Sequence, residues 1–90
     1  MTVGSLPWPT IEREVSSAAR SYFAEHHGQQ KEFIQVHFLA DYLYYEANPE
    51  LYPHLTGLGW QTIKTRCRTA MVRMGWEQFS QHAFKVGGKG

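Results

Sequence analysis

Cysteine is almost absent from the 90-residue chain, which contains Cys67 alone. One cysteine cannot form an intramolecular disulfide, and it cannot build a thiolate metal cluster within one chain. Stability is therefore expected to come from packing. Arg66 and Arg68 would lower the pKa of a neighbouring thiol, but Cys67 falls on the apolar side of a predicted helix. We expect a small buried hydrophobic residue rather than a reactive thiol.

Long apolar runs are absent as well. No stretch approaches the roughly 18 apolar residues of a membrane span. Residues 1–10 have neither the basic start nor the apolar run of a signal peptide. We therefore expect a soluble protein that does not enter the membrane and that lies in the cytoplasm or with the nucleoid.

Patterns that indicate catalysis or a metal site are lacking too. No Ser-His-Asp set, carboxylate pair or H-E-x-x-H motif can be assembled from the spacing, so we expect the protein not to be an enzyme. Among the five histidines, His26 and His27 are adjacent, and adjacent helical side chains do not converge on one ion. Their expected role is to place favourable partial charge at the end of a helix. The sequence predicts no metal and no cofactor.

The chain does contain enough apolar material for one core, because 42% of its residues are hydrophobic and 14% are aromatic. Gly and Pro residues mark positions 1–9 as an irregular leader, and glycines mark positions 87–90 as a flexible tail. One domain is therefore expected over residues 10–86.

The first helix is predicted over residues 11–27, because apolar residues between Ile11 and Phe23 recur at helical spacing. Thr10 is its expected N-cap, since a threonine hydroxyl accepts hydrogen bonds from the free amides of a first turn. Gly28 is expected to end the helix.

Shorter elements follow the first helix. The β-prone residues 33–36 predict a brief strand, and residues 38–45 predict a short second helix that ends before Asn48-Pro49. The loop over residues 48–59 is rich in Pro and Gly, and its leucines and tyrosine are expected to anchor it partly in the core. Near the end of the chain, two β-prone runs predict a small hairpin over residues 76–86.

The third helix, predicted over residues 60–74 with Gly75 as its terminator, is the clearest amphipathic helix of the chain. Opposite its apolar side lie Gln, Thr and Arg side chains, flanked by further Lys and Arg. Such a surface offers donors, acceptors and methyl groups to base edges, while the flanking cations can neutralise phosphates. Its apolar side consists of Ile63, Cys67, Ala70, Met71 and Met74.

Charge is unevenly distributed, although the net charge is only +1. Residues 1–56 contain three basic and seven acidic residues, whereas residues 57–90 contain six basic residues and one acidic residue. This asymmetry favours a polyanion that meets the C-terminal part of the chain. The alternative is a solvated basic helix face without a partner.

The order helix, short strand, short helix, loop, basic helix and hairpin resembles the winged helix-turn-helix DNA-binding superfamily over residues 11–86. The stretch Thr62-Ile63-Lys64-Thr65-Arg66-Cys67-Arg68, followed by Met74-Gly75-Trp76, is similar to that family's recognition helix and the start of its wing. The resemblance implies a mostly α fold with a small β-hairpin, that is, a three-helix winged helix-turn-helix-like domain. The chain departs from the pattern in its longer connection before the third helix and in its short wing.

In this family the third helix enters the major groove, and the hairpin lies against the backbone or the minor groove. The resemblance implies a double-stranded DNA partner and a role as a small regulator or as the DNA-contacting module of a replication or mobile-element protein. Five residues would face bases and four would contact phosphates. The base-facing residues are Gln61, Thr62, Thr65, Arg68 and Thr69, and the phosphate-contacting residues are Lys64, Arg66, Arg73 and Lys85.

A protein-interaction or assembly module is the alternative function, in which the third helix binds an acidic partner. The second helix carries more aromatic rings than it can bury, so an exposed Tyr44 or Tyr45 would mark a homodimer contact. The same rings could instead pack beneath the Pro-rich loop. The salt dependence of DNA binding separates the two functions, because phosphate contacts give a steep negative slope.

Overall fold

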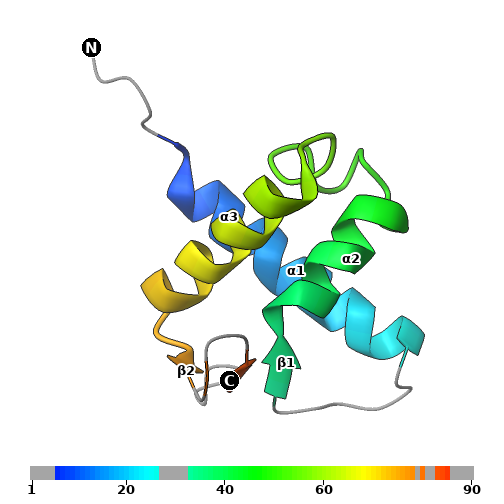
Figure 1. Ribbon diagram of the computed structural model, residues 1–90. Helices are drawn as coiled ribbons and strands as arrows, with labels where there is room; N and C mark the ends of the chain where they lie inside the picture. Colours follow the sequence, from blue (N-terminus) through cyan, green and yellow to red (C-terminus); the bar gives the residue numbers. More distant parts are fainter. Residues whose placement is uncertain (1–5, 27–32, 79, 81–82, 86–90) are drawn as a thin grey trace.

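The computed structural model describes residues 6–26, 33–78, 80 and 83–85 of the chain (Figure 1). Within these residues it contains three helices and a three-stranded antiparallel sheet. The predicted fold class, a mostly α domain of three helices with a small β-hairpin, is confirmed. The helices are α1 (Trp8–His26), α2 (Val36–Tyr45) and α3 (Trp60–Arg73), and the strands are β1 (Phe33–Gln35), β2 (Glu77–Gln78) and β3 (Ala83–Lys85).

Several predictions fall outside the described residues. They concern residues 1–5 of the leader, the end of the first helix at His27 and Gly28, positions 79, 81 and 82 of the hairpin, and residues 86–90. In the described part of the chain, no helix is long and apolar enough to cross a membrane.

The first helix starts earlier than predicted. α1 begins at Trp8, so the expected N-cap Thr10 lies inside its first turn and the expected leader of residues 1–9 overlaps the helix. Pro9 permits this start, because the first N–H groups of a helix have no intrahelical partner and a proline there loses nothing. The N–H of Ile11 donates to the Pro7 carbonyl (3.0 Å) and closes the first turn.

The three helices share one core. Figure 1 shows α3 crossing α1, with α2 beside it and the small sheet at one end of the helices. Each helix buries one face, at the spacing that the sequence predicted for α1 and α3. The largest fully buried side chains are Tyr52, Phe84, Ile11, Leu39, Leu43, Leu55, Ile63, Met71, Val15, Val36 and Cys67.

Cys67 lies in this core, as predicted for a small hydrophobic residue. Burial raises the pKa of its thiol from an ordinary value of 9.0 to about 12, because the thiolate would lose its hydration. The protein at neutral pH therefore carries a neutral thiol at this position.

The raised pKa of Cys67 predicts a loss of stability in alkali. A group whose pKa is higher in the folded state contributes stability below its unfolded pKa, and this contribution disappears as the pH rises towards the folded pKa. Between pH 8 and pH 10.5 we expect the wild type to lose about 2 kcal/mol more than Cys67→Ala. Urea unfolding at both pH values measures this difference, and equal losses in the two proteins would contradict it.

The connection between α2 and α3 is partly anchored in the core, as predicted. Tyr52 and Leu55 are buried there. Gly57 has a φ of +83°, a left-handed conformation that glycine adopts without steric cost. At the end of the connection, the indole N–H of Trp60 donates to Asp41 Oδ1 (2.6 Å). This bond ties the start of α3 to α2.

Gly75 ends α3, as predicted, with a φ of +82°. Its N–H donates to the Val72 carbonyl (3.0 Å), and the N–H of Trp76 donates to the Met71 carbonyl (3.0 Å). This pair of bonds is the Schellman arrangement, which satisfies the last carbonyls of a helix and requires a left-handed residue. The chain is thereby turned from α3 towards β2.

The sheet is the element that the sequence predicted least completely. The predicted hairpin is present as β2 and β3, but β3 also pairs with β1, giving the order β1-β3-β2. Phe84 in the central strand lies opposite Ile34 of β1 and Gln78 of β2. Val36, which was expected to end the first strand, is the first residue of α2.

Candidate nucleic-acid interface

α3 has two distinct faces, as its sequence predicted. Ile63, Cys67, Ala70 and Met71 are buried, and all five predicted base-facing residues lie on the other side of the helix. Three of the five are exposed and two are half-buried. The exposed residues are Gln61, Thr62 and Thr65, and the half-buried residues are Arg68 and Thr69.

Two details of this outer face differ from the expectation. Val72 is 54% exposed and lies among the polar residues, although it was not among the predicted contacts. A helical projection of the sequence would have found it, because it falls between Gln61 and Thr65 in angle. Arg68 has its Nε atom shielded from solvent, so only part of its guanidinium group reaches the surface.

The predicted phosphate contacts on α3 are held by neighbouring groups. The Lys64 Nζ lies 5.3 Å from the centre of the Trp60 ring, and Arg66 Nη1 donates to the His54 carbonyl (3.0 Å). Within the described residues, neither the Lys64 nor the Arg66 side chain is paired with a carboxylate. Both positive charges can therefore interact with an anionic partner. Cation–π contacts of this kind hold a side chain without neutralising it.

Arg73 differs from these two cations, because its charge is offset. Its Nε donates to Glu12 Oε2 of α1 (2.8 Å), and its guanidinium group lies 5.2 Å from the centre of the Trp8 ring. Lys85 is the one predicted contact outside α3. It lies in β3, opposite Phe33 and Glu77 in the strand register.

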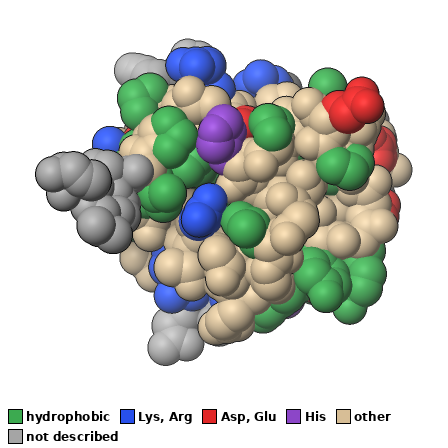
Figure 2. Space-filling model, turned by 90° about the horizontal axis from the view of Figure 1, so that it is seen from above, with side chains coloured by type: hydrophobic (Ala, Val, Ile, Leu, Met, Phe, Trp, Pro, Cys, Tyr) green, Lys and Arg blue, Asp and Glu red, His purple; other side chains and the backbone are tan. Residues whose placement is uncertain are grey.

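On the face seen in Figure 2, most charges of opposite sign lie apart. Figure 2 shows Lys and Arg side chains on the left and in the middle of the molecule, and most of the Asp and Glu side chains towards the right edge. The right side in this view is the side of α2 and of the connection that follows it in Figure 1. The described acidic residues of that region are Asp41, Glu46 and Glu50.

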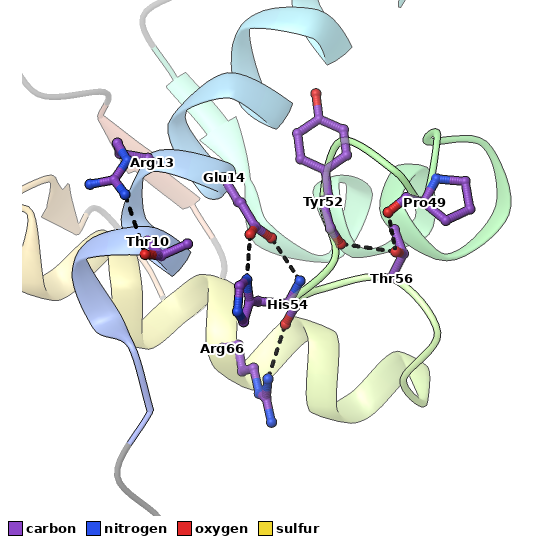
Figure 3. A network of polar contacts seen from close by, with 8 residues as sticks. All are labelled: Thr10, Arg13, Glu14, Pro49, Tyr52, His54, Thr56 and Arg66. Atoms are coloured by element: carbon purple, nitrogen blue, oxygen red, sulfur yellow. Dashed lines mark hydrogen bonds and ion pairs between the residues drawn. The ribbon is translucent and has the colours of Figure 1, made fainter.

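A network of polar contacts positions the middle of α3 (Figure 3). Glu14 is only 8% exposed and accepts from the backbone N–H of His54 (3.0 Å) and from its Nδ1 (2.6 Å). The His54 carbonyl in turn accepts from Arg66. A chain of hydrogen bonds therefore runs from α1 through the α2–α3 connection to α3.

This network was not predicted from the sequence, although one signal for it is present there. Glu14 lies among Ile11, Val15 and Ala18 on the apolar face of α1, where a carboxylate needs a partner. The identity of that partner could not be predicted, because His54 is 40 positions away in the sequence.

Comparisons with protein-family models, curated proteins and solved structures found no match for the chain. Membership of the winged helix-turn-helix superfamily therefore stays a prediction. Among the described residues, no three His, Cys, Asp or Glu side chains gather closely enough to hold a metal ion. The outer face of α3 is the strongest candidate site on these residues.

Proposed function

We propose that the protein binds double-stranded DNA through the outer face of α3. The observation that carries the proposal is this face itself, a row of exposed Gln and Thr side chains beside Lys64 and Arg66, whose charges have no carboxylate partner in the described structure. The protein would serve as a small regulator or as the DNA-contacting module of a replication or mobile-element protein.

The chemistry of this face matches the major groove. Glutamine can bond both N6 and N7 of adenine, arginine can bond O6 and N7 of guanine, and the threonine methyl can contact thymine. α3 has 14 residues and is therefore about 21 Å long, and a helix fits the width of the major groove. Lys64 and Arg66 on the flanks would contact phosphates and fix the register.

DNA is a better partner for this domain than single-stranded RNA. RNA-binding sheets display aromatic side chains on which bases stack. Here the strands have only two or three residues, and Phe84 of the central strand is fully buried. The polar residues lie on a helix instead.

Fluorescence anisotropy with a random 20-base-pair duplex tests this proposal. We expect micromolar binding at low salt that weakens steeply with salt, because each phosphate contact releases counterions. Replacing both Lys64 and Arg66, two of the predicted phosphate contacts, with glutamine should lower the steepness of the log K against log salt plot by about 2 units, at about 0.9 per contact.

The matched control is Arg13→Gln/Arg20→Gln, which removes two exposed cations from the outer side of α1. This variant should bind almost as well as the wild type. An equal loss in both variants would mean that net charge, and not α3, causes the binding. Thermal unfolding of each variant by circular dichroism verifies that the fold is retained.

A second candidate function is assembly through α2. Tyr44 and Tyr45 are 49% and 75% exposed, and their rings meet edge to face with centres 4.8 Å apart. This patch favours a homodimer contact, with α3 free to bind an acidic partner. Absence of DNA binding at low salt, together with dimers in sedimentation velocity, would favour this candidate.

A further inference from the structure

A groove of about 320 Å³ lies along one side of α3. One wall is apolar and consists of Leu6 and Trp8, at the start of α1. The other wall is the outer face of α3 and is polar. It consists of Gln61, Thr62, Thr65, Arg66 and Thr69, four of which belong to the predicted base-facing set.

The apolar wall is held in place by several contacts. The N–H of Trp8 donates to the Leu6 carbonyl (2.8 Å), which fixes the backbone between the two residues. The Arg73 guanidinium group covers the Trp8 ring at 5.2 Å, and Arg73 is itself bound to Glu12. Both apolar side chains also pack against the edge of the core. The wall therefore needs little ordering when a ligand enters the groove.

We propose that this groove recognises the 5-methyl group of thymine, so that the protein prefers an A·T pair beside α3. The inference rests on the proposed DNA function. The thymine methyl is the largest apolar group that base pairs present in the major groove, where cytosine offers only a C5–H and most other exposed groups are hydrogen-bond donors and acceptors. A leucine and an indole beside a polar helix face thus complement a base edge that carries a methyl group.

The proposal also explains why an apolar wall would stand beside this polar face. A G·C pair would place only the C5–H of cytosine and polar groups against Leu6 and Trp8, so that the apolar wall would lose the methyl contact and face the N4 amino group instead of O4. A thymine in the same place keeps its O4 near the hydroxyl and amide groups of α3 while its methyl group contacts the wall. The apolar wall and the polar face of α3 would then both favour thymine.

Two 20-base-pair duplexes test the proposal, alternating d(AT) and alternating d(AU), which differ only in the methyl groups. We expect the wild type to bind the thymine duplex about fourfold more tightly, the effect of burying one methyl group. In Leu6→Ser and in Trp8→Ala this ratio should fall below twofold. Because the ratio compares two ligands of one protein, a loss of stability in a variant does not change it.

Two further variants sharpen the test. Trp8→Phe keeps an aromatic wall and should retain the ratio, and so should Leu51→Ala, which removes an exposed leucine (63%) from the α2–α3 connection. Equal binding of both duplexes by the wild type, or an unchanged ratio in Leu6→Ser and Trp8→Ala, would overturn the methyl recognition alone. No binding to either duplex at low salt would overturn the DNA function together with this inference.

Discussion

Replacing Phe84 with alanine is expected to lower the free energy of unfolding by about 3–5 kcal/mol. Phe84 is completely buried although it belongs to a strand of three residues. Its strand is central and pairs with both β1 and β2, so this ring and Ile34 of β1 attach the sheet to the helical core. Removing it leaves a cavity, which a strand pinned on both sides cannot close by moving inward.

A loss of this size is a large part of the total stability of a small domain, which is about 5–15 kcal/mol. Urea unfolding followed by tryptophan fluorescence measures it. Phe84→Leu is the matched control and should lose much less, because it keeps most of the apolar volume. A loss below about 1 kcal/mol in Phe84→Ala would contradict the packing of the sheet on the core.

Replacing Glu14 with alanine is expected to cost about 2–4 kcal/mol. The carboxylate accepts two hydrogen bonds from His54, and its removal leaves the partly buried N–H of that residue without a protein acceptor. Bonds to a charged group contribute more than neutral ones, and a partly buried donor that loses its acceptor adds a cost of its own. Glu14→Gln keeps an acceptor for the N–H and should lose less than half as much.

Glu12→Ala is a matched control on the same helix. Glu12 also accepts a bond from a distant residue, Arg73, but that pair is exposed and should contribute less than about 1 kcal/mol. Equal losses in Glu14→Ala and Glu12→Ala would contradict a structural role for the buried carboxylate. Because His54 also binds Arg66, Glu14→Ala should in addition weaken DNA binding more than Glu12→Ala does.

The sequence predicted a structural feature correctly where that feature depends on the residues of one helix or strand alone. The faces of α3 and its end at Gly75 were predicted correctly, because helical periodicity and a left-handed glycine act within a few residues. The start of α1 lies earlier than predicted, because the prediction assigns Pro9 to an irregular leader. Proline is in fact compatible with the first turn of a helix.

The residues that make up the candidate site could also be predicted in part from the sequence. The base-facing residues share one side of α3 because side-chain direction follows from helical geometry. The sequence did not predict which of the cations is offset by a neighbouring carboxylate. Arg73 has the same charge as Arg66, yet only Arg73 meets a carboxylate, and that carboxylate is 61 positions away.

The sequence by itself determined that three helices and short strands form, which residues of α1 and α3 face the core, and which polar and basic residues α3 presents together. Only the tertiary structure decided that β1 joins β3, that Glu14 binds His54, and that Trp8 forms a wall beside α3. The physical reason is that periodicity describes how one segment divides its side chains between core and solvent. Contacts between distant segments depend on how the folded chain brings them together, and no single segment carries that information.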